Sequence, residues 1–182
     1  SDQLYDGKNK SKYLEKDSLN PINWYVESKR ECENLIKKLK KSTIIRTNFF
    51  GWAPVVRKSF SDFIIFNSQN KKISLYDNIF YTPIVINQLV NIISIIIDKE
   101  IYGVFNVTSR EKISKFDFGL KVKKIFKLRH KILKTKYVNI ESKTQRPLNM
   151  SLSNRKIEKR LALKIPSLNS QIKELYKEYK NL

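Results

Sequence analysis

The sequence predicts an α/β fold with a parallel sheet. Residues 21–41 have the pattern of a long helix, and residues 42–47, which follow at once, have the β-branched pattern of a buried strand. Residues 103–107 form a second buried-strand pattern. A helix that leads directly into such a strand is typical of an α/β unit with parallel strands. The 182 residues include only four glycines and five prolines, which favours regular elements joined by short loops.

The first elements are marked by turn and cap signals. Asp6-Gly7 is a turn signal, so we expect a strand end before it and a polar loop at Lys8–Ser11. Asn20 followed by Pro21 has the form of a helix cap with proline in the first turn. The helix predicted over residues 21–41 carries recurring apolar positions, which are Trp24, Cys32, Leu35 and Ile36, and it ends on Lys40-Lys41.

The remaining elements alternate in the same way. The strand at 42–47 is short and is bounded by Gly51 and Pro54. Ser114, with Asp117 three residues later, resembles a capping box that opens a helix to about Phe126. Further patterns predict helices over residues 59–69, 84–98 and from Leu168 to Tyr179, and a strand over 72–76.

The chain is strongly basic. Its 37 Lys and Arg against 17 Asp and Glu give a net charge of +20, which would suit nucleic acid or an anionic membrane. The lysines are scattered over expected solvent faces and form no stripe with aromatic or arginine side chains, so we expect neither partner. A basic cleft would equally suit a substrate that carries a pyrophosphate.

Cysteine usage and hydropathy limit the class of protein further. Cys32 is alone, so the sequence supports neither a disulfide framework nor a zinc site. The N-terminal residues lack a signal-peptide pattern, and the most apolar stretch, Ile92–Ile97, is far shorter than a membrane span. We therefore expect a cytoplasmic protein.

A candidate for chemistry is the pair Tyr25 and Lys29, four residues apart on the first predicted helix. This spacing places both side chains on one helix face. An ammonium beside a phenol stabilises the phenolate, which makes the phenol a better proton donor toward a carbonyl oxygen. The spacing alone is weak evidence, because Tyr176 and Lys180 repeat it in a Lys-rich chain.

The surrounding residues make the pair more informative. The order SDQLYDG, NPINWYVESKRECENLI, IIRTNFFGW resembles the extended short-chain dehydrogenase/reductase superfamily, and within it the dTDP-4-dehydrorhamnose reductase family. The resemblance continues through YTPIVINQLVNII, GVFNVTSREKISKFDFG and RPLNMSLSNRKIEKRL, and so covers nearly the whole chain. It implies the C-terminal part of a Rossmann-like, doubly wound parallel sheet with an interleaved small substrate-binding domain.

The resemblance implies roles for individual residues. Ser1 matches the residue that hydrogen-bonds the substrate carbonyl, Tyr25 the proton donor, and Lys29 the residue that activates the tyrosine and holds the nicotinamide ribose. These three are the implied catalytic residues, and Tyr25 and Lys29 would also contact the cofactor. The implied substrate-binding residues are Ser1, Asp2, Asn48, Phe49 and Arg146.

Simpler interpretations stay open for the weaker candidates. Asp2 could be a turn former, Phe49 and Phe50 core aromatics, and Arg146 a surface charge before a proline. Gln3 stands where related sugar-nucleotide dehydratases carry a second acid, which favours a reductase over a dehydratase.

The resemblance also implies a domain layout. Residues 1–58 would be the C-terminal part of the Rossmann domain with the active-site helix. Residues 59–182 would be the interleaved substrate-binding region, with the last Rossmann helix and strand at 84–107. No glycine-rich dinucleotide turn occurs in the sequence, so we expect the N-terminal half of the fold to be missing and this chain alone to pack loosely and bind no NAD(P)H.

The implied activity is NADPH- or NADH-dependent reduction of a 4-keto group on a nucleotide-linked deoxysugar, in the synthesis of cell-surface polysaccharide precursors. Some members of the family use magnesium, although no carboxylate cluster here demands it, and a homodimer is a further expectation. The alternatives are a sugar-nucleotide epimerase and a non-catalytic regulatory or binding protein on the same fold.

Overall fold

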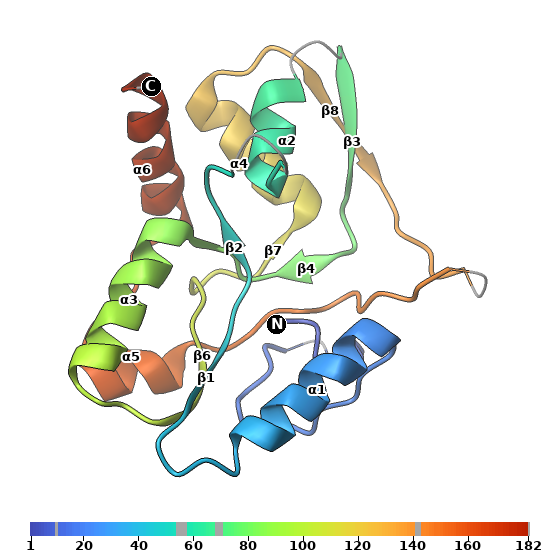
Figure 1. Ribbon diagram of the computed structural model, residues 1–182. Coiled ribbons are helices and arrows are strands. Elements are labelled where there is room, and N and C mark those ends of the chain that lie inside the picture. The colour runs from blue at the N-terminus through green and yellow to red at the C-terminus, as the bar shows by residue number, and fades with distance from the viewer. Residues whose placement is uncertain (10, 54–57, 68–70, 141–142, 182) are drawn as a thin grey trace.

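The protein, represented by a computed structural model, combines helices and strands along the whole chain (Figure 1). The structure describes residues 1–9, 11–53, 58–67, 71–140 and 143–181. The helices are α1 (Trp24–Ile36), α2 (Phe60–Phe66), α3 (Ile86–Asp98), α4 (Lys115–Phe126), α5 (Arg155–Leu161) and α6 (Leu168–Lys180). The strands are β1 (Thr43–Arg46), β2 (Phe49–Phe50), β3 (Lys72–Tyr76), β4 (Phe80–Tyr81), β5 (Ile84–Val85), β6 (Gly103–Asn106), β7 (Ile113–Ser114) and β8 (Lys131–Thr135).

Parallel pairing dominates the strands. β1 pairs with β6 in parallel, with Thr43 opposite Gly103 and Arg46 opposite Asn106. The pairs β2 with β5 and β3 with β8 are also parallel, whereas β4 and β7 are antiparallel. Helix α3 lies between β5 and β6 along the chain. The predicted α/β class with parallel strands is therefore confirmed.

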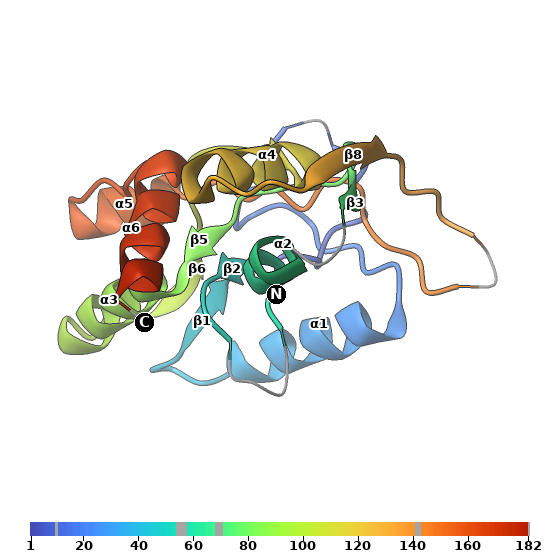
Figure 2. The ribbon, with the colours of Figure 1, turned by 90° about the horizontal axis from the view of Figure 1, so that it is seen from above.

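Helices lie on both sides of the β1–β6 pair. Helix α1 contacts β1, and α5 contacts β6. Seen from above, α1 and α5 lie on opposite sides of these strands (Figure 2). A core beside β6 combines Phe105 with residues of α3 and α5, among them Leu89, Ile92, Ile96, Ile157 and Leu161.

A second core lies between α2, α4, α6 and β3. It includes Ile64 of α2, Phe118 and Val122 of α4, and Ile172 of α6, all fully buried. Burial of such side chains is worth about 1.5 to 3 kcal/mol each. This core holds the first turn of α4 in place beside β4 and β7, where the candidate site lies.

Helix α1 is shorter than the predicted helix over 21–41. Asn23 caps it, because the Asn23 Oδ1 atom accepts from the Val26 N–H at 2.9 Å. Asn20, the predicted cap, instead donates to Asp6 Oδ2 at 3.1 Å. The helix ends at Ile36, whose carbonyl accepts from the Ser42 hydroxyl at 2.9 Å.

The expected apolar face of α1 is largely exposed. Trp24 is 90% and Leu35 63% exposed, Cys32 is exposed too, and Ile36 is partly buried. Only Val26 and Glu33 of this helix are buried. The apolar positions predicted for this helix are therefore not the residues by which α1 packs against the protein.

Other boundaries differ for reasons of strand pairing. The helix predicted over 84–98 begins at Ile86, because Ile84 and Val85 pair with Phe49 and Phe50 as strand β5. The strands predicted over 42–47 and 103–107 pair with each other as β1 and β6. Residues 1–5 form no strand, since none of them pairs with a described strand.

The remaining predicted elements agree closely with the structure, apart from one helix end. Residues 72–76 form β3, and α4 begins after Ser114, whose hydroxyl oxygen accepts from the Asp117 N–H at 3.0 Å. Helix α2 ends at Phe66, three residues before its predicted end, and residues 68–70 lie outside the described residues. The expected domain boundary after residue 58 adjoins residues 54–57, which are also outside them, and stays a prediction.

Candidate active site

Asp2 and Asn48 meet at the C-terminal end of β1. The Asn48 side-chain amide donates to Asp2 Oδ2 at 2.8 Å. Asp2 is only 4% exposed, and this burial raises the pKa of its carboxyl, while the Asn48 hydrogen bond opposes the shift. The structure thus brings together two of the predicted substrate-binding residues.

Tyr25 and Lys29 lie side by side on α1, as their spacing predicts. The Lys29 Nζ atom is 5.4 Å from the centre of the Tyr25 ring, and the Tyr25 side chain is 56% exposed. The start of this helix is tied to a distant segment, because the Asn23 amide donates to the Gln145 carbonyl at 2.8 Å. Helix α1 is therefore anchored next to Arg146, the predicted substrate residue that follows Gln145.

Ser1 is partly buried near the same helix. Its hydroxyl oxygen accepts from the Gln3 N–H at 3.2 Å. Its proposed contact with a substrate carbonyl stays a prediction.

A buried polar cluster holds α1 against the strand. Arg46, at the end of β1, is 1% exposed and binds both carboxylate oxygens of Glu33 on α1. It also donates to the Tyr5 hydroxyl at 2.7 Å and to the Glu15 carbonyl at 3.2 Å. Burial raises the pKa of Tyr5 to about 12, so this phenol stays neutral and accepts the Arg46 bond.

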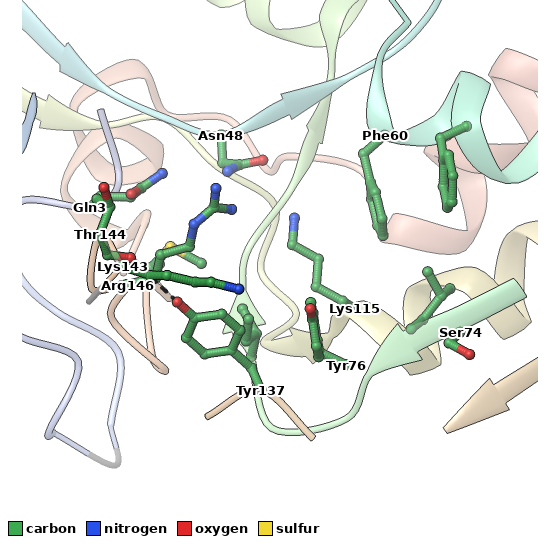
Figure 3. Close-up of a pocket in the computed structure, with 14 residues that line it drawn as sticks. Gln3, Asn48, Phe60, Ser74, Tyr76, Lys115, Tyr137, Lys143, Thr144 and Arg146 are labelled. Atoms are coloured by element: carbon green, nitrogen blue, oxygen red, sulfur yellow. Dashed lines mark hydrogen bonds between the residues drawn. The ribbon is translucent and has the colours of Figure 1, made fainter. Parts of the chain in front are cut away.

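A pocket of about 960 Å³ opens beside Asn48 (Figure 3). Three cationic side chains point into it, Lys115 from the start of α4 and Lys143 and Arg146 from the segment after β8, and no carboxylate is among its described lining residues. Aromatic and polar side chains complete the wall, including Gln3, Asn48, Phe60, Tyr76 and Tyr137. Such a lining suits a ligand that joins an anionic group to a flat or apolar part.

Lys115 has a distinctive setting within this pocket. Its Nζ atom is 3.6 Å from the centre of the Tyr81 ring and 4.4 Å from that of Phe60. Burial lowers the pKa of Lys115 to about 8; the charge of Asp2 opposes this shift and that of Arg146 adds to it. The aromatic faces stabilise the charged form without supplying a hydrogen-bond acceptor.

The pocket includes some predicted site residues and not others. Asn48 and Arg146 line it, and Asp2 accepts a hydrogen bond from the Asn48 amide without lining the pocket. Ser1, Tyr25 and Lys29 are not among its lining residues. Phe49 is 57% exposed on β2 and is also absent from the lining, whereas Phe50 is buried in the core, as its alternative interpretation expected.

Sequence reasoning missed Lys115, Phe60 and Tyr137 as site residues. One signal was available for Lys115, which follows the predicted cap Ser114 and so places a cation at the first position of a helix. Cations are disfavoured there, because the helix dipole is positive at its N-terminus. Tyr137 carried no such signal, since it reaches the pocket only through the course of the segment after β8.

The described residues contain no group of three or more His, Cys, Asp or Glu side chains placed to hold a metal ion. These residues therefore offer no cluster of side chains that could bind magnesium. Within the same residues, no helix has the length and apolar character needed to cross a membrane.

The chain was compared with protein-family models and with known proteins. The family model described as RmlD substrate binding domain matches residues 1–181. No curated protein sequence matches the chain.

Solved structures share the fold. A dTDP-4-dehydrorhamnose reductase from Clostridium acetobutylicum matches with a TM-score of 0.88 and 23% identity, over 100% of this chain and 64% of that one. One from Bacillus anthracis, in complex with NADP, matches with a TM-score of 0.89 and 22% identity, over 97% and 63%. A dTDP-glucose 4,6-dehydratase from Bacillus anthracis, in complex with NAD, matches with a TM-score of 0.79 and 15% identity, over 100% and 60%. The chain thus spans less than two thirds of the length of these proteins, and at these identities the likeness concerns the fold.

Proposed function

The chain belongs to the family of RmlD substrate binding domains, and on this premise we propose that it serves an NAD(P)H-dependent reductase of nucleotide-linked 4-keto deoxysugars. Its part in that enzyme would be to bind the nucleotide sugar and to supply the proton that completes reduction of the ketone. The solved structures of the same fold that are named as dTDP-4-dehydrorhamnose reductases support this choice.

The observation that carries the proposal is the charge pattern of the pocket. Lys115, Lys143 and Arg146 face a hollow whose described lining has no carboxylate, which favours a diphosphate. Tyr76 and Tyr137, with ring centres 5.3 Å apart, offer flat apolar surface for a base or sugar face. At about 960 Å³ the pocket is large enough for a nucleotide sugar.

The residues that the sequence predicts as catalytic carry the side chains that carbonyl reduction needs. Tyr25 would donate a proton to the ketone oxygen, and the Lys29 ammonium beside its ring would stabilise the phenolate left behind. Ser1 would hold the same oxygen, and Asp2, Asn48 and the exposed Phe49 would position the sugar. The hydride itself would come from NADPH or NADH, whose ribose Lys29 would contact.

Gln3 supports a reductase over a dehydratase. It lines the pocket directly after Asp2, at the position where we expect a dehydratase to need a second acid. An amide cannot take up or release a proton in elimination of water, so a single proton donor on α1 is the simpler mechanism.

Calorimetric titration with dTDP and with thymidine tests the proposed binding. We expect dTDP to bind at least tenfold more tightly than thymidine, because only dTDP carries the diphosphate that the cations recognise. Arg146→Met should weaken dTDP binding and leave thymidine binding unchanged. Equal affinity for dTDP and thymidine would contradict the proposed substrate class.

A further inference from the structure

Lys115 holds its ammonium group against two aromatic rings. Its Nζ atom lies over the rings of Phe60 on α2 and Tyr81 on β4. Within the described part of the chain, its ammonium takes part in no ion pair or hydrogen bond. Three N–H donors therefore remain for water or a ligand. Figure 3 shows the side chain extending into the pocket.

The position of Lys115 is unfavourable for local structure. It is the first residue of α4, where the helix dipole disfavours a cation, and Asp117 occupies the same turn as the favoured anion. Asp117 bonds the Ser114 hydroxyl at 2.6 Å and so completes the cap without Lys115. A cation at this helix position does not stabilise the fold, and residues that are unfavourable for local structure are expected at functional sites.

We propose that Lys115 is the specificity residue of this pocket, the side chain that recognises the phosphate charge of the ligand and orients it toward Asn48. The inference rests on the proposed function, since it assigns a role within the same nucleotide-sugar site. Arg146 and Lys143 are exposed side chains of the segment after β8, whereas Lys115 is partly buried and fixed by two rings. A fixed cation orients a phosphate better than a mobile one.

This role makes ligand binding depend on protons. Burial holds the pKa of free Lys115 at about 8, so near pH 8 about half of the molecules carry a neutral amine. An anion beside the amine favours its charged form, so binding raises this pKa and draws a proton from solution. Affinity should therefore fall as the pH rises above about 8.

Other groups around Lys115 do not explain such proton uptake. Arg146 stays charged throughout this range. Burial raises the pKa of Tyr81 well above 10, so this phenol stays neutral. A charged Lys115 ammonium would favour the ionised Asp2 carboxylate. Asp2 would therefore release a proton on binding, whereas the inference predicts uptake. Phosphate groups with a pKa near 6 are already ionised at pH 8.

Calorimetric titration of the protein with dTDP at pH 8, in two buffers of different ionisation enthalpy, tests the inference. For the unaltered protein we expect uptake of up to about half a proton per dTDP bound. Lys115→Met should weaken binding by about tenfold to a hundredfold and abolish the uptake. Lys115→Arg, whose charge is permanent, should bind dTDP without proton uptake.

Lys124→Met is the matched control, because it removes one positive charge from an exposed position of the same helix. It should change affinity less than twofold and keep the proton uptake. If Lys115→Met, with an unchanged melting temperature, behaves like Lys124→Met, or if Lys115→Arg still takes up protons, the role of Lys115 is wrong while the substrate class stands. If the unaltered protein does not distinguish dTDP from thymidine, the proposed function itself fails, and this inference with it.

Discussion

Arg46 and Glu33 form a buried, two-point ion pair that joins the end of β1 to α1. The Arg46 Nε atom lies 3.0 Å from Glu33 Oε1, and Nη2 lies 2.7 Å from Oε2. Glu33 is one turn beyond Lys29 on the same helix. The pair therefore sets the position of the helix that carries Tyr25 and Lys29.

Arg46→Met should lower the free energy of unfolding by about 3 to 5 kcal/mol, because the buried Glu33 carboxylate then keeps only the exposed Lys37, whose Nζ atom is 3.7 Å away. Urea unfolding would measure this. The double variant Arg46→Met with Glu33→Leu should recover much of the loss, since no buried charge remains. Lys134→Met, which breaks the pair between the exposed Lys134 and the partly buried Asp77, should cost less than about 1 kcal/mol. Similar costs for Arg46→Met and Lys134→Met would contradict the structural role of the buried pair.

Tyr25→Phe should abolish ketone reduction and leave cofactor affinity nearly unchanged, because it removes only the transferable proton. Steady-state kinetics on a protein that joins this chain to a dinucleotide-binding half would measure it. Tyr176→Phe, in the second Tyr/Lys pair on α6, is the control and should leave turnover unchanged. Turnover of Tyr25→Phe within about tenfold of the unaltered protein would show that Tyr25 is not the proton donor.

Lys29→Met should weaken both cofactor affinity and turnover in the same joined protein. The ammonium 5.4 Å from the Tyr25 ring would no longer stabilise the phenolate, so the dependence of the rate on pH should change shape. Lys180→Met, which removes the matching lysine beside Tyr176, should leave the profile as it is. An unchanged pH profile for Lys29→Met would mean that Lys29 is an ordinary surface lysine.

Gly7→Ala should destabilise the protein more than Gly103→Ala. Both glycines have positive φ angles, of 77° and 121°, which strain an alanine. An added Cβ at Gly7 would also lie 2.6 Å from the Leu148 nitrogen and 2.7 Å from the Pro147 Cβ, whereas at Gly103 the nearest atom is 3.8 Å away. Thermal unfolding of the two variants would compare them. Equal losses would show that the turn at Gly7 does not pack closely against the segment that carries Arg146.

Asp2→Asn should make stability less dependent on pH in the weakly acidic range. Burial raises the pKa of the folded Asp2 carboxyl above its ordinary value of 3.8, so the folded state holds this proton more tightly than the unfolded state. The resulting stabilisation is complete below pH 3.8 and is lost as the pH rises through the folded pKa. Relative to the unaltered protein, Asp2→Asn should therefore gain stability as the pH rises across this window. Urea unfolding between about pH 4 and 7 would measure the free energy of unfolding of both proteins. The same pH dependence in both would contradict the raised pKa of Asp2.

The sequence by itself determined the α/β class, the positions of most helices and strands, and the Tyr25–Lys29 pair. These depend on local periodicity and on spacing along one helix, which neighbouring residues encode. The family resemblance also led to Asn48 and Arg146, which do line the pocket.

Only the tertiary structure decided where α1 begins, which strands pair, and that Lys115 is a pocket residue. Asn23 replaced Asn20 as the cap of α1 because Asn20 bonds Asp6 instead, and the Asn23 amide bonds Gln145, 122 residues away. Lys115 reaches the pocket because β4, α2 and α4 converge there and place the rings of Tyr81 and Phe60 around its ammonium. Such contacts join segments far apart in the chain. The residues next to each contacting side chain therefore do not predict which distant residue it meets.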